Sequence, residues 1–366
     1  MKIVHVITAF GIGGAEKLLL NTINLQIINH EVHLVYFKKI EDLLPELNKK
    51  VKVKNIPLSL FVSKNLRNYF KSVNPNIIHT HLGHADIIGI WSSRGLNNKV
   101  FCTMHNIHFK KNYLDKIFFR IYRYLFLRVS KDIRVISISK SVEHHVINRL
   151  KLNKRQSFLL YNAIPLVSNT KSRENIRQDL KISQDKIILL FLGRLTKQKS
   201  IDTLLKSIKL LKDKGYGKLF ELLIVGDGNL RRPLELMAQG LEINNMIRFE
   251  GNKLKVSDYF KIADIFILPS VWEGFGIVIL EAFSAKTAVI ASSIEGPSEL
   301  IKNNVNGLLF EPKNYVELSK KIIKLMDNSY LRNKIADAGY ASFVNNFEIG
   351  EYVDKLNELY KNAIDA

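Results

Sequence analysis

The sequence predicts an α/β protein with two doubly wound parallel-sheet domains, and three observations support this class. The chain has 366 residues, which is too long for one ordinary core and fits two domains of average size. Apolar strand-like runs alternate with amphipathic helical stretches along the chain, as is typical of parallel sheets covered by helices. This alternation restarts near residue 185, after a polar segment at 161–176 that is expected to be a linker.

The strands follow in order from short apolar runs. In the first half they are expected at KIVHVIT, EVHLVYF, NIIHTH, VFCTMH and RVISIS, which begin at residues 2, 31, 76, 100 and 134. In the second half they are KIILLFLG, FELLIVGDG, IRFEG, DIFILPS and TAVIAS, which begin at residues 186, 220, 247, 264 and 287. We therefore expect domains at 1–165 and 166–346, followed by an amphipathic helix at 347–366.

Composition narrows the classes of protein. Cys102 is the only cysteine, so no intramolecular disulfide can form and a cytoplasmic location is expected. We expect neither a signal peptide nor a membrane-spanning segment, because the apolar runs are far too short. Residues 1–165 carry 26 Lys and Arg against 9 Asp and Glu, a net charge of +17 of the total +21. This asymmetry favours an anionic partner, such as a nucleic acid, a membrane face or an acidic substrate, although it could also serve solubility alone.

Two carboxylates flank a glycine turn in ADIFILPSVWEGFGIVILEAF, residues 263–283. Gly274 and Gly276 permit positive φ, and the helix that follows offers N–H groups to an oxygen-rich ligand. Glu273 would lie before this helix and Glu281 in its second turn, at the edge of the sheet where open α/β folds bind ligands. Carboxylates accept hydrogen bonds from vicinal hydroxyls, so a sugar or ribose site is one interpretation. The alternative is that Glu273 caps the helix and Glu281 faces solvent.

Two further turns could contact phosphate. In FLGRLTKQKSIDTLLKSI, residues 191–208, Arg194 and Lys199 flank a polar loop before a helix, as suits a diphosphate, although two solvated bases would look the same. In TAFGIGGAEKLLL, residues 8–20, the glycines match a dinucleotide fingerprint only in part, because Glu16 stands where the third glycine would be. Nicotinamide binding is therefore disfavoured.

Five segments together resemble the family-four retaining glycosyltransferases of the GT-B fold, whose two Rossmann-like domains face a central cleft. They are GGAE (13–16), GRLTKQKS (193–200), VGDGNLRRPLE (225–235), PSVWEGFGIVILEA (269–282) and EGPSELIKNNVNGLLFEP (295–312). Glu273 and Glu281 meet the E-x7-E motif of that family. The resemblance covers nearly the whole chain and is strongest from residue 185 to 312. It implies that 1–165 is the acceptor domain, that 166–346 binds the nucleotide sugar, and that the final helix crosses back to the first domain.

The resemblance also implies roles for individual residues. Arg194 and Lys199 would bind the donor diphosphate, which the backbone of Gly14 approaches. Glu281 would hold the ribose, and Glu273 would lie beside the donor sugar, with His105 where the family often has a functional histidine. The backbone of Gly274, Phe275 and Gly276 would contact the sugar hydroxyls. Ser200 departs from the family, which usually has glycine after the lysine, and this puts the backbone geometry of the loop in doubt.

The function implied is transfer of a sugar, with retention, from a nucleoside-diphosphate sugar to a saccharide or lipid-linked saccharide in bacterial surface polysaccharide or lipopolysaccharide synthesis. The donor is most often a UDP-sugar in this family, and no cofactor is expected. No Asp-x-Asp occurs in the chain, so we expect no metal, with cations stabilising the leaving diphosphate instead. The expected partners are the donor, an anionic or lipid-linked acceptor and an anionic membrane surface on the inner face of the cell membrane.

Other interpretations stay open. His79 and His81 lie on one face of a strand and His84 follows, which could form a zinc site, although hydrogen-bonded polar loop residues would explain His79, His84 and His108 equally. A basic and aromatic stretch at 109–131 could lie on an anionic bilayer or be a core helix, with Leu114, Ile117, Ile121 and Leu125 inward. The stretch 60–72 is a second candidate of this kind. The rival functions are a GT-B nucleotide-sugar epimerase and a non-enzymatic polyanion-binding protein, although no nucleic-acid-binding signature is found.

Overall fold

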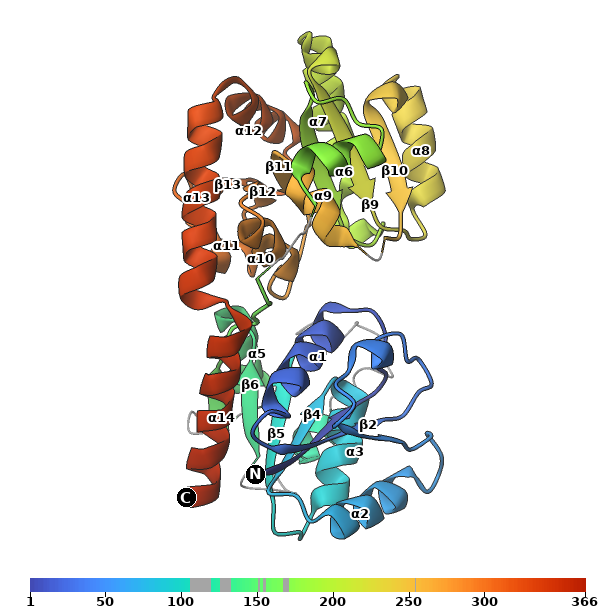
Figure 1. Ribbon diagram of the computed structural model, residues 1–366, viewed down its shortest axis with the longest axis vertical. Coiled ribbons are helices and arrows are strands. Elements are labelled where there is room, and N and C mark those ends of the chain that lie inside the picture. The colour runs from blue at the N-terminus through green and yellow to red at the C-terminus, as the bar shows by residue number, and fades with distance from the viewer. Residues whose placement is uncertain (106–119, 126–132, 151, 154–155, 167–170, 254) are drawn as a thin grey trace. The chain divides into compact units, whose positions relative to one another are not determined.

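The computed structural model describes the chain except for residues 106–119, 126–132, 151, 154–155, 167–170 and 254 (Figure 1). It divides into two compact units, each built on its own parallel sheet. Unit 1 comprises Met1–Pro165 and Ile349–Ala366, and unit 2 comprises Leu166–Glu348. Every pair of neighbouring strands in both sheets is parallel among the described residues. This confirms the α/β class with two doubly wound sheets.

Unit 1 holds a seven-stranded sheet in the order β3-β2-β1-β4-β5-β6-β7. Its strands are β1 (Lys2–Ile7), β2 (Glu31–Tyr36), β3 (Lys52–Asn55), β4 (Ile77–His81), β5 (Lys99–Met104), β6 (Arg134–Ser137) and β7 (Ser157–Leu159). Its helices include α1 (Gly14–Gln26), α2 (Val62–Val73), α3 (Gly83–Ser93), α5 (Lys140–Leu150) and α14 (Ile349–Asp365). The strand order reverses between β1 and β4, and this is the position at which open α/β sheets form a ligand-binding crevice.

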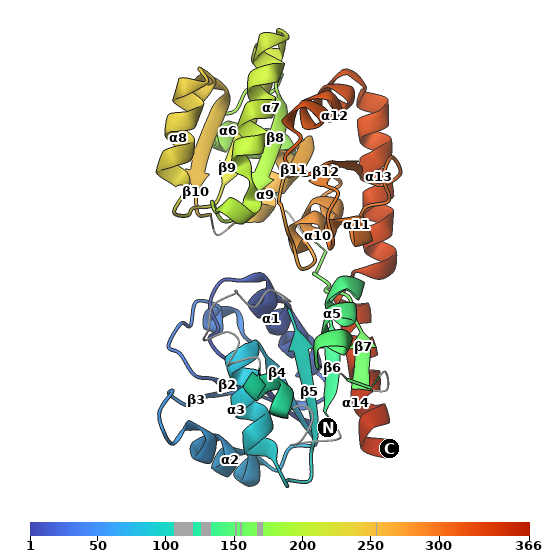
Figure 2. The ribbon, with the colours of Figure 1, turned by 180° about the vertical axis from the view of Figure 1, so that it is seen from behind.

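The two faces of the unit 1 sheet are covered by different helices. Apolar residues of α2 and α3 pack on one face, against Val4, Val6 and Ile78. On the other face, α14 buries Tyr352, Leu356 and Tyr360 against β1, β4 and β5. Figures 1 and 2 show α14 beside α1 and β5. The final helix therefore completes the core of unit 1, because the sheet would otherwise expose apolar residues on this face.

Unit 2 holds a six-stranded sheet in the order β10-β9-β8-β11-β12-β13. Its strands are β8 (Ile187–Leu192), β9 (Phe220–Val225), β10 (Ile247–Gly251), β11 (Ile265–Leu268), β12 (Ala288–Ser292) and β13 (Leu308–Phe310). Its helices are α6 (Arg173–Asp179), α7 (Ile201–Asp213), α8 (Arg231–Gly240), α9 (Val256–Ile262), α10 (Ile277–Ser284), α11 (Pro297–Leu300), α12 (Tyr315–Asp327) and α13 (Ser329–Asn346). The strands between the sheet edges are almost fully buried, which explains their continuous apolar runs.

Some sequence predictions need correction. The short edge strands β3, β7 and β13 were not predicted, since β3 reads KVKN and the other two have three residues each. His79 lies inside β4, so it is no loop residue. Most of 109–131, including Leu114 and Ile117, and His108 lie outside the described residues. Within 120–125, Ile121 is 45% exposed while Tyr122 and Leu125 are buried, so the expected inward face is wrong at Ile121. Among the described helices, none has both the length and the apolar character needed to cross a bilayer.

Candidate functional site

The candidate site in unit 2 is built where β8 and β11, which are neighbours in the sheet, reach their carboxyl ends. The loop after β8 carries Lys199, and the turn after β11 carries Glu273. The ammonium Nζ of Lys199 donates a hydrogen bond to Oε1 of Glu273 at 2.5 Å. The fold therefore brings together two predicted site residues that are 74 positions apart in the chain.

The carboxylate of Glu273 has a second partner, because the hydroxyl of Ser270 donates to the same Oε1 at 2.6 Å. The side chains of Lys199 and Glu273 are only 13% and 10% exposed. A charge so far removed from water needs a partner, and removing one member of such a pair leaves the other charge uncompensated. Glu273 is therefore the counter-ion of Lys199.

Backbone contacts hold the two loops in register. The amide of Val271 donates to the carbonyl of Gln198 at 2.9 Å. The side-chain amide of Gln198 in turn donates to the carbonyl of Trp272 at 3.0 Å. Gln198 thus connects the two loops on either side of the ion pair, so the spacing between Lys199 and Glu273 is set by several bonds at once.

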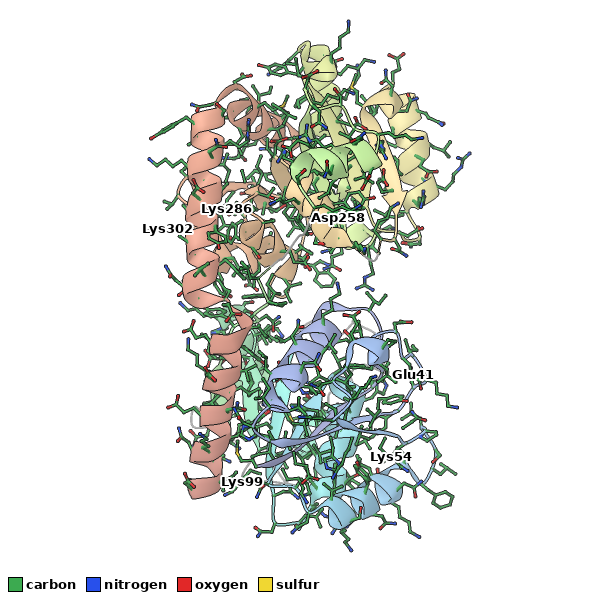
Figure 3. The ribbon with its side chains drawn as sticks, in the orientation of Figure 1. Glu41, Lys54, Lys99, Asp258, Lys286 and Lys302 are labelled. Atoms are coloured by element: carbon green, nitrogen blue, oxygen red, sulfur yellow. The ribbon has the colours of Figure 1, made fainter. Side chains whose placement is uncertain are left out.

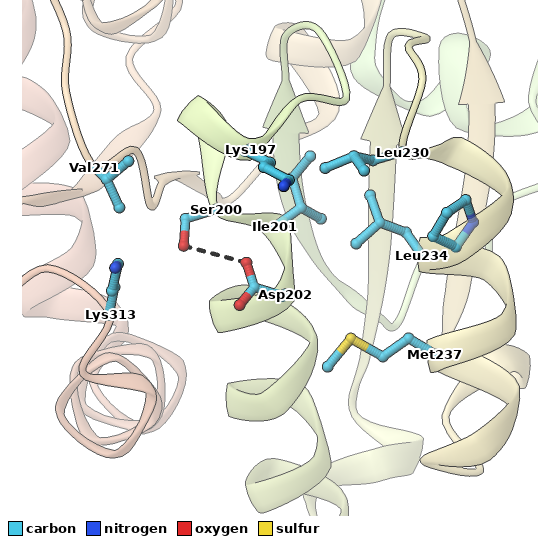
Figure 4. Close-up of a pocket in the computed structure, with 10 residues that line it drawn as sticks. Lys197, Ser200, Ile201, Asp202, Leu230, Leu234, Met237, Val271 and Lys313 are labelled. Atoms are coloured by element: carbon cyan, nitrogen blue, oxygen red, sulfur yellow. Dashed lines mark hydrogen bonds between the residues drawn. The ribbon is translucent and has the colours of Figure 1, made fainter.

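Ser200 has the backbone conformation that glycine favours. Its φ of 46° and ψ of 47° lie in the left-handed region, just before α7 begins at Ile201. Its hydroxyl donates to Oδ1 of Asp202 at 3.2 Å (Figure 4). The same hydroxyl lies 2.9 Å from Oγ1 of Thr203. A left-handed residue other than glycine costs about 1 kcal/mol, and these local hydrogen bonds offset part of it. The serine therefore adopts the left-handed conformation that a glycine at this position would favour.

Three glycines that were quoted within motifs, but not proposed as site residues, shape these loops. A Cβ on Gly226 would lie 2.1 Å from the carbonyl oxygen of Gly193, and one on Gly228 would lie 2.5 Å from that of Leu195. A Cβ on Gly296, whose φ is 83°, would lie 2.9 Å from the carbonyl oxygen of Glu273. Only glycine permits these close approaches of backbone to backbone. The glycines in VGDG and EGP were visible in the sequence, but the backbone contacts that require them are tertiary contacts and could not be predicted from it.

The other predicted residues of unit 2 lie on the same loops or on the helix that follows. Gly276 has a φ of 88° and directly precedes α10, so it is the turn residue that needs glycine. Phe275 is buried, with its ring 6.2 Å from that of Phe347. Glu281 is half-buried in the second turn of α10, whereas Arg194 is exposed on the loop after β8. The site therefore combines a nearly dry ion pair with a cation that is open to solvent.

A pocket of about 510 Å³ lies beside this loop, at the start of α7 (Figure 4). It is lined by Lys197, Ser200, Ile201, Asp202, Leu230, Pro233, Leu234, Met237, Val271 and Lys313. Lys199 and Glu273 are not among its lining residues, so the pocket is a neighbour of the ion pair and not the candidate site itself. Most of its lining is apolar, which does not suit a diphosphate.

Unit 1 holds the other two predicted residues, Gly14 and His105. Gly14 is the first residue of α1, directly after the glycine turn that follows β1. His105 follows β5, and burial lowers its pKa to about 4, so its imidazole is neutral at physiological pH. Its Nε2 atom is buried and has no hydrogen-bond partner in the part of the chain that the structure describes. Gly14 and His105 are thus at carboxyl ends of unit 1 strands.

A histidine cluster lies on the face of the unit 1 sheet that α14 covers. His5, His79 and His81 are buried, and one ring nitrogen from each lies within 4.8 Å of the others, which is the only such metal-like group among the described residues. Burial lowers the pKa of each, so all three are neutral. The His-x-His pattern therefore does place two histidines together, joined by a third from β1 that was not predicted.

Hydrogen bonds already account for most of the ring nitrogens in this cluster. His79 lies 2.5 Å from the hydroxyl of Tyr360 and 2.7 Å from that of Thr103. His5 lies 2.8 Å from Oε1 of Gln26 and 3.1 Å from Nε2 of His81. A metal would have to displace several of these bonds, so the arrangement favours a hydrogen-bonded core over a zinc site.

The opposite face of β4 holds a buried carboxyl group, Asp86 in the first turn of α3. The hydroxyl of Thr80 donates to its Oδ1 at 2.6 Å, and that of Tyr122 donates to its Oδ2 at 2.7 Å. Burial raises the pKa of Asp86 to about 6, and these hydrogen bonds oppose only part of the effect. Asp86 therefore binds a proton more tightly in the folded protein than in the unfolded chain.

This carboxyl group makes stability depend on pH. Between about pH 4 and pH 6, Asp86 is deprotonated in the unfolded chain but still protonated in the folded protein. The free energy of unfolding therefore falls as the pH rises, by about 3 kcal/mol in total. We expect Asp86→Asn to remove this contribution, so that the difference in unfolding free energy between pH 4 and pH 8 changes by about 3 kcal/mol relative to wild type. Urea titrations followed by Trp91 fluorescence, in a Trp272→Phe background, measure it. If the unfolding free energy of the two proteins changed with pH in the same way, the raised pKa of Asp86 would be contradicted.

Comparisons with known proteins agree with this architecture. Residues 12–167 match the family model Glycosyltransferase Family 4, and residues 172–342 match Glycosyl transferases group 1. The two matches together span nearly the whole chain. The chain therefore belongs to these glycosyltransferases, which confirms the resemblance found in the sequence, and it is an enzyme of that class.

Two relatives and one solved structure show how far the likeness extends. An uncharacterised glycosyltransferase of Methanocaldococcus jannaschii is 28% identical over 66% of this chain, and the match spans 63% of that relative. The GalNAc-alpha-(1->4)-GalNAc-alpha-(1->3)-diNAcBac-PP-undecaprenol alpha-1,4-N-acetyl-D-galactosaminyltransferase of Campylobacter jejuni is 25% identical over 92% of both chains. The crystal structure of HepE of Anabaena in complex with UDP has a TM-score of 0.87 at 19% identity, covering 99% of this chain and 100% of that one. The fold is therefore that of the GT-B glycosyltransferases.

Proposed function

We propose that this glycosyltransferase moves a sugar, with retention and without a metal ion, from a UDP-sugar to a saccharide or lipid-linked saccharide in bacterial surface polysaccharide or lipopolysaccharide synthesis. The observation that carries the proposal is the ion pair of Lys199 and Glu273 at adjoining strand ends of unit 2. It supplies a cation for the diphosphate and a carboxylate for the sugar within 2.5 Å of each other.

The chemistry follows from these charges. When the bond between the sugar and the diphosphate breaks, negative charge develops on the departing phosphate oxygen. Lys199 and Arg194 stabilise this charge without moving far, which is how prepositioned cations lower a barrier. As the diphosphate takes over Lys199, Glu273 is released to accept hydrogen bonds from the sugar hydroxyls, and Glu281 holds the ribose.

Unit 1 contributes the acceptor side of this proposal. We propose that the backbone of Gly14 at the start of α1 binds a phosphate group and that the neutral imidazole of His105 contacts a sugar. The Campylobacter relative acts, by its name, on a saccharide linked to undecaprenol through a diphosphate. An acceptor of this kind suits the excess of cations in residues 1–165. We further propose that the protein works in the cytoplasm, at the inner face of the cell membrane.

Product analysis tests this proposal. We expect turnover of a UDP-sugar with a lipid-linked saccharide acceptor in the presence of EDTA, and NMR of the product should show the anomeric configuration of the donor. A product of the opposite configuration, or activity that requires added Mg²⁺, would contradict the mechanism. Conversion of the donor sugar without any acceptor would instead indicate an epimerase.

A further inference from the structure

One loop of unit 1 exposes apolar side chains that the core does not use. Leu60 is 100% exposed, Phe61 is 65% exposed and Leu58 is 43% exposed, all within the connection between β3 and α2. Single exposed apolar residues are common on soluble proteins, but three of them within four consecutive residues form a local apolar tip. The tip is not the inward face of α2, because that face is formed by Leu66, Phe70 and Val73, which are buried.

Exposed lysines come before and after this tip in the chain. Lys54 on the edge strand β3, and Lys64 and Lys71 on α2, are exposed, and Figure 3 marks Lys54 at this edge of unit 1. From residue 47 to residue 85 the sequence has seven Lys and Arg and no Asp or Glu. The segment that contains the apolar tip is therefore strongly cationic, and its charge adds an electrostatic attraction to the apolar one.

Two of the seven cations are engaged within unit 1. Lys52 pairs with Glu31 at 2.7 Å. The guanidinium of Arg67 donates to the carbonyls of Ser92 and Arg94, at 3.0 and 2.5 Å, and so ties α2 to the end of α3. The helix that directly follows the tip is thus fixed on unit 1, which favours a surface that is presented rigidly over one that forms on binding.

We propose that the tip of Leu58, Leu60 and Phe61, with Lys54, Lys64 and Lys71, is a docking surface for an anionic lipid bilayer, and we name it the β3–α2 surface. The apolar side chains enter the boundary between headgroups and acyl chains, while the lysines contact anionic headgroups. This inference deepens the proposed function, on which it rests for its biological meaning, because it names the surface that brings the enzyme to a lipid-linked acceptor.

The charge complementarity selects the bilayer as the partner. A nucleic acid would be bound by the lysines alone and would leave the apolar tip in water. A membrane uses both parts of the surface, because apolar insertion and attraction to anionic lipid act together. The two partners therefore differ in what they require of Leu60 and Phe61.

Vesicle sedimentation with the full chain tests the inference. The probe is phosphatidylcholine vesicles with and without phosphatidylglycerol, and the variant is Leu60→Asp with Phe61→Asp. Phe61 is the residue directly before α2, where aspartate caps a helix well, so the change should not unfold the helix. The matched control is Tyr330→Asp, an aromatic residue that is 77% exposed near the start of α13 in unit 2.

We expect wild type to bind the vesicles that contain phosphatidylglycerol and to be released by high salt. The double variant should bind them at least about tenfold more weakly, and Tyr330→Asp should bind like wild type. Lys64→Glu with Lys71→Glu should weaken binding by at least about fivefold for each lysine. Absence of vesicle binding by wild type, or equal binding by the double variant, would overturn the inference. A general polyanion surface would give a different result. Wild type would bind heparin and RNA as strongly as vesicles, and the double variant would retain all three kinds of binding.

Calorimetric titration with UDP separates this inference from the proposed function. The β3–α2 surface contains none of the proposed donor-site residues, so the double variant should bind UDP with wild-type affinity. If wild type fails to bind UDP but still sediments with anionic vesicles, the donor site is wrong and the surface stands. If it binds UDP but ignores vesicles, the surface is wrong and the donor site stands.

Discussion

Glu273→Gln is expected to lower kcat for sugar transfer by at least about 100-fold while leaving the affinity for UDP unchanged or higher. The carboxylate is the counter-ion of Lys199, and glutamine keeps its size without its charge. Removing the charge frees Lys199 for the diphosphate, so nucleotide binding should not suffer. Loss of one prepositioned electrostatic group at a reacting centre costs about 100- to 1,000-fold in rate.

The two effects are measured separately, by steady-state kinetics and by calorimetric titration with UDP. Lys199→Met is the matched variant, because it removes the other half of the same ion pair. It should weaken UDP binding as well as transfer, since the methionine offers no charge to the diphosphate. Equal losses of UDP affinity in both variants would mean that Glu273 supports the nucleotide site and not the sugar.

Arg177→Met is expected to destabilise unit 2 by about 3–5 kcal/mol, the largest stability effect that we expect of a single substitution. The side chain of Arg177 is only 3% exposed, and its guanidinium bonds to Asp264 at 3.2 Å. It also donates to the carbonyls of Ser183, Gln184 and Lys186 at 3.1, 2.9 and 3.1 Å. Methionine fills a similar volume but leaves these carbonyls and Asp264 without the donor that they share, and the loss of one member of a buried pair costs this much.

The neighbouring pair gives the control. Arg173 bonds to the same carboxylate, Asp264, at 2.8 Å, but its side chain is 34% exposed. We expect Arg173→Ala to cost less than about 1 kcal/mol, as is usual for partly exposed ion pairs. Urea unfolding followed by Trp272 fluorescence, in a Trp91→Phe background, compares the two. A similar loss of unfolding free energy in both variants would show that burial does not determine the contribution of these two arginines to stability.

The strands that build the site were predictable because their sequences are apolar throughout. Runs such as IILLFL and IFIL can only be buried, and parallel sheets bury both faces. The edge strand β3 was missed because KVKN has three polar residues and is largely exposed, as edge strands commonly are. Its sequence carries too little apolar signal to be distinguished from a loop.

The charged members of the unit 2 site were predictable for a different reason. Lys199 and Glu273 stand beside glycine turns at the ends of apolar strands, so their residue types and positions indicated a ligand. Their mutual contact was not predictable, because it depends on β8 and β11 being neighbours in a sheet whose order differs from the order in the chain. The close approach of Gly296 to Glu273 and the joining of His5 to His79 and His81 depend on tertiary packing in the same way.

Calorimetric titration of the protein with UDP, GDP and ADP in the presence of EDTA tests the donor site most directly. We expect UDP to bind without metal, and Glu281→Ala to weaken UDP binding by about 1–3 kcal/mol, the cost of a lost hydrogen bond to a charged group. Glu299→Ala, which removes a carboxylate from α11 outside the proposed site, serves as the control and should bind like wild type. Failure of all three nucleotides to bind without metal, or equal binding by the wild type and Glu281→Ala, would contradict the donor site drawn on unit 2.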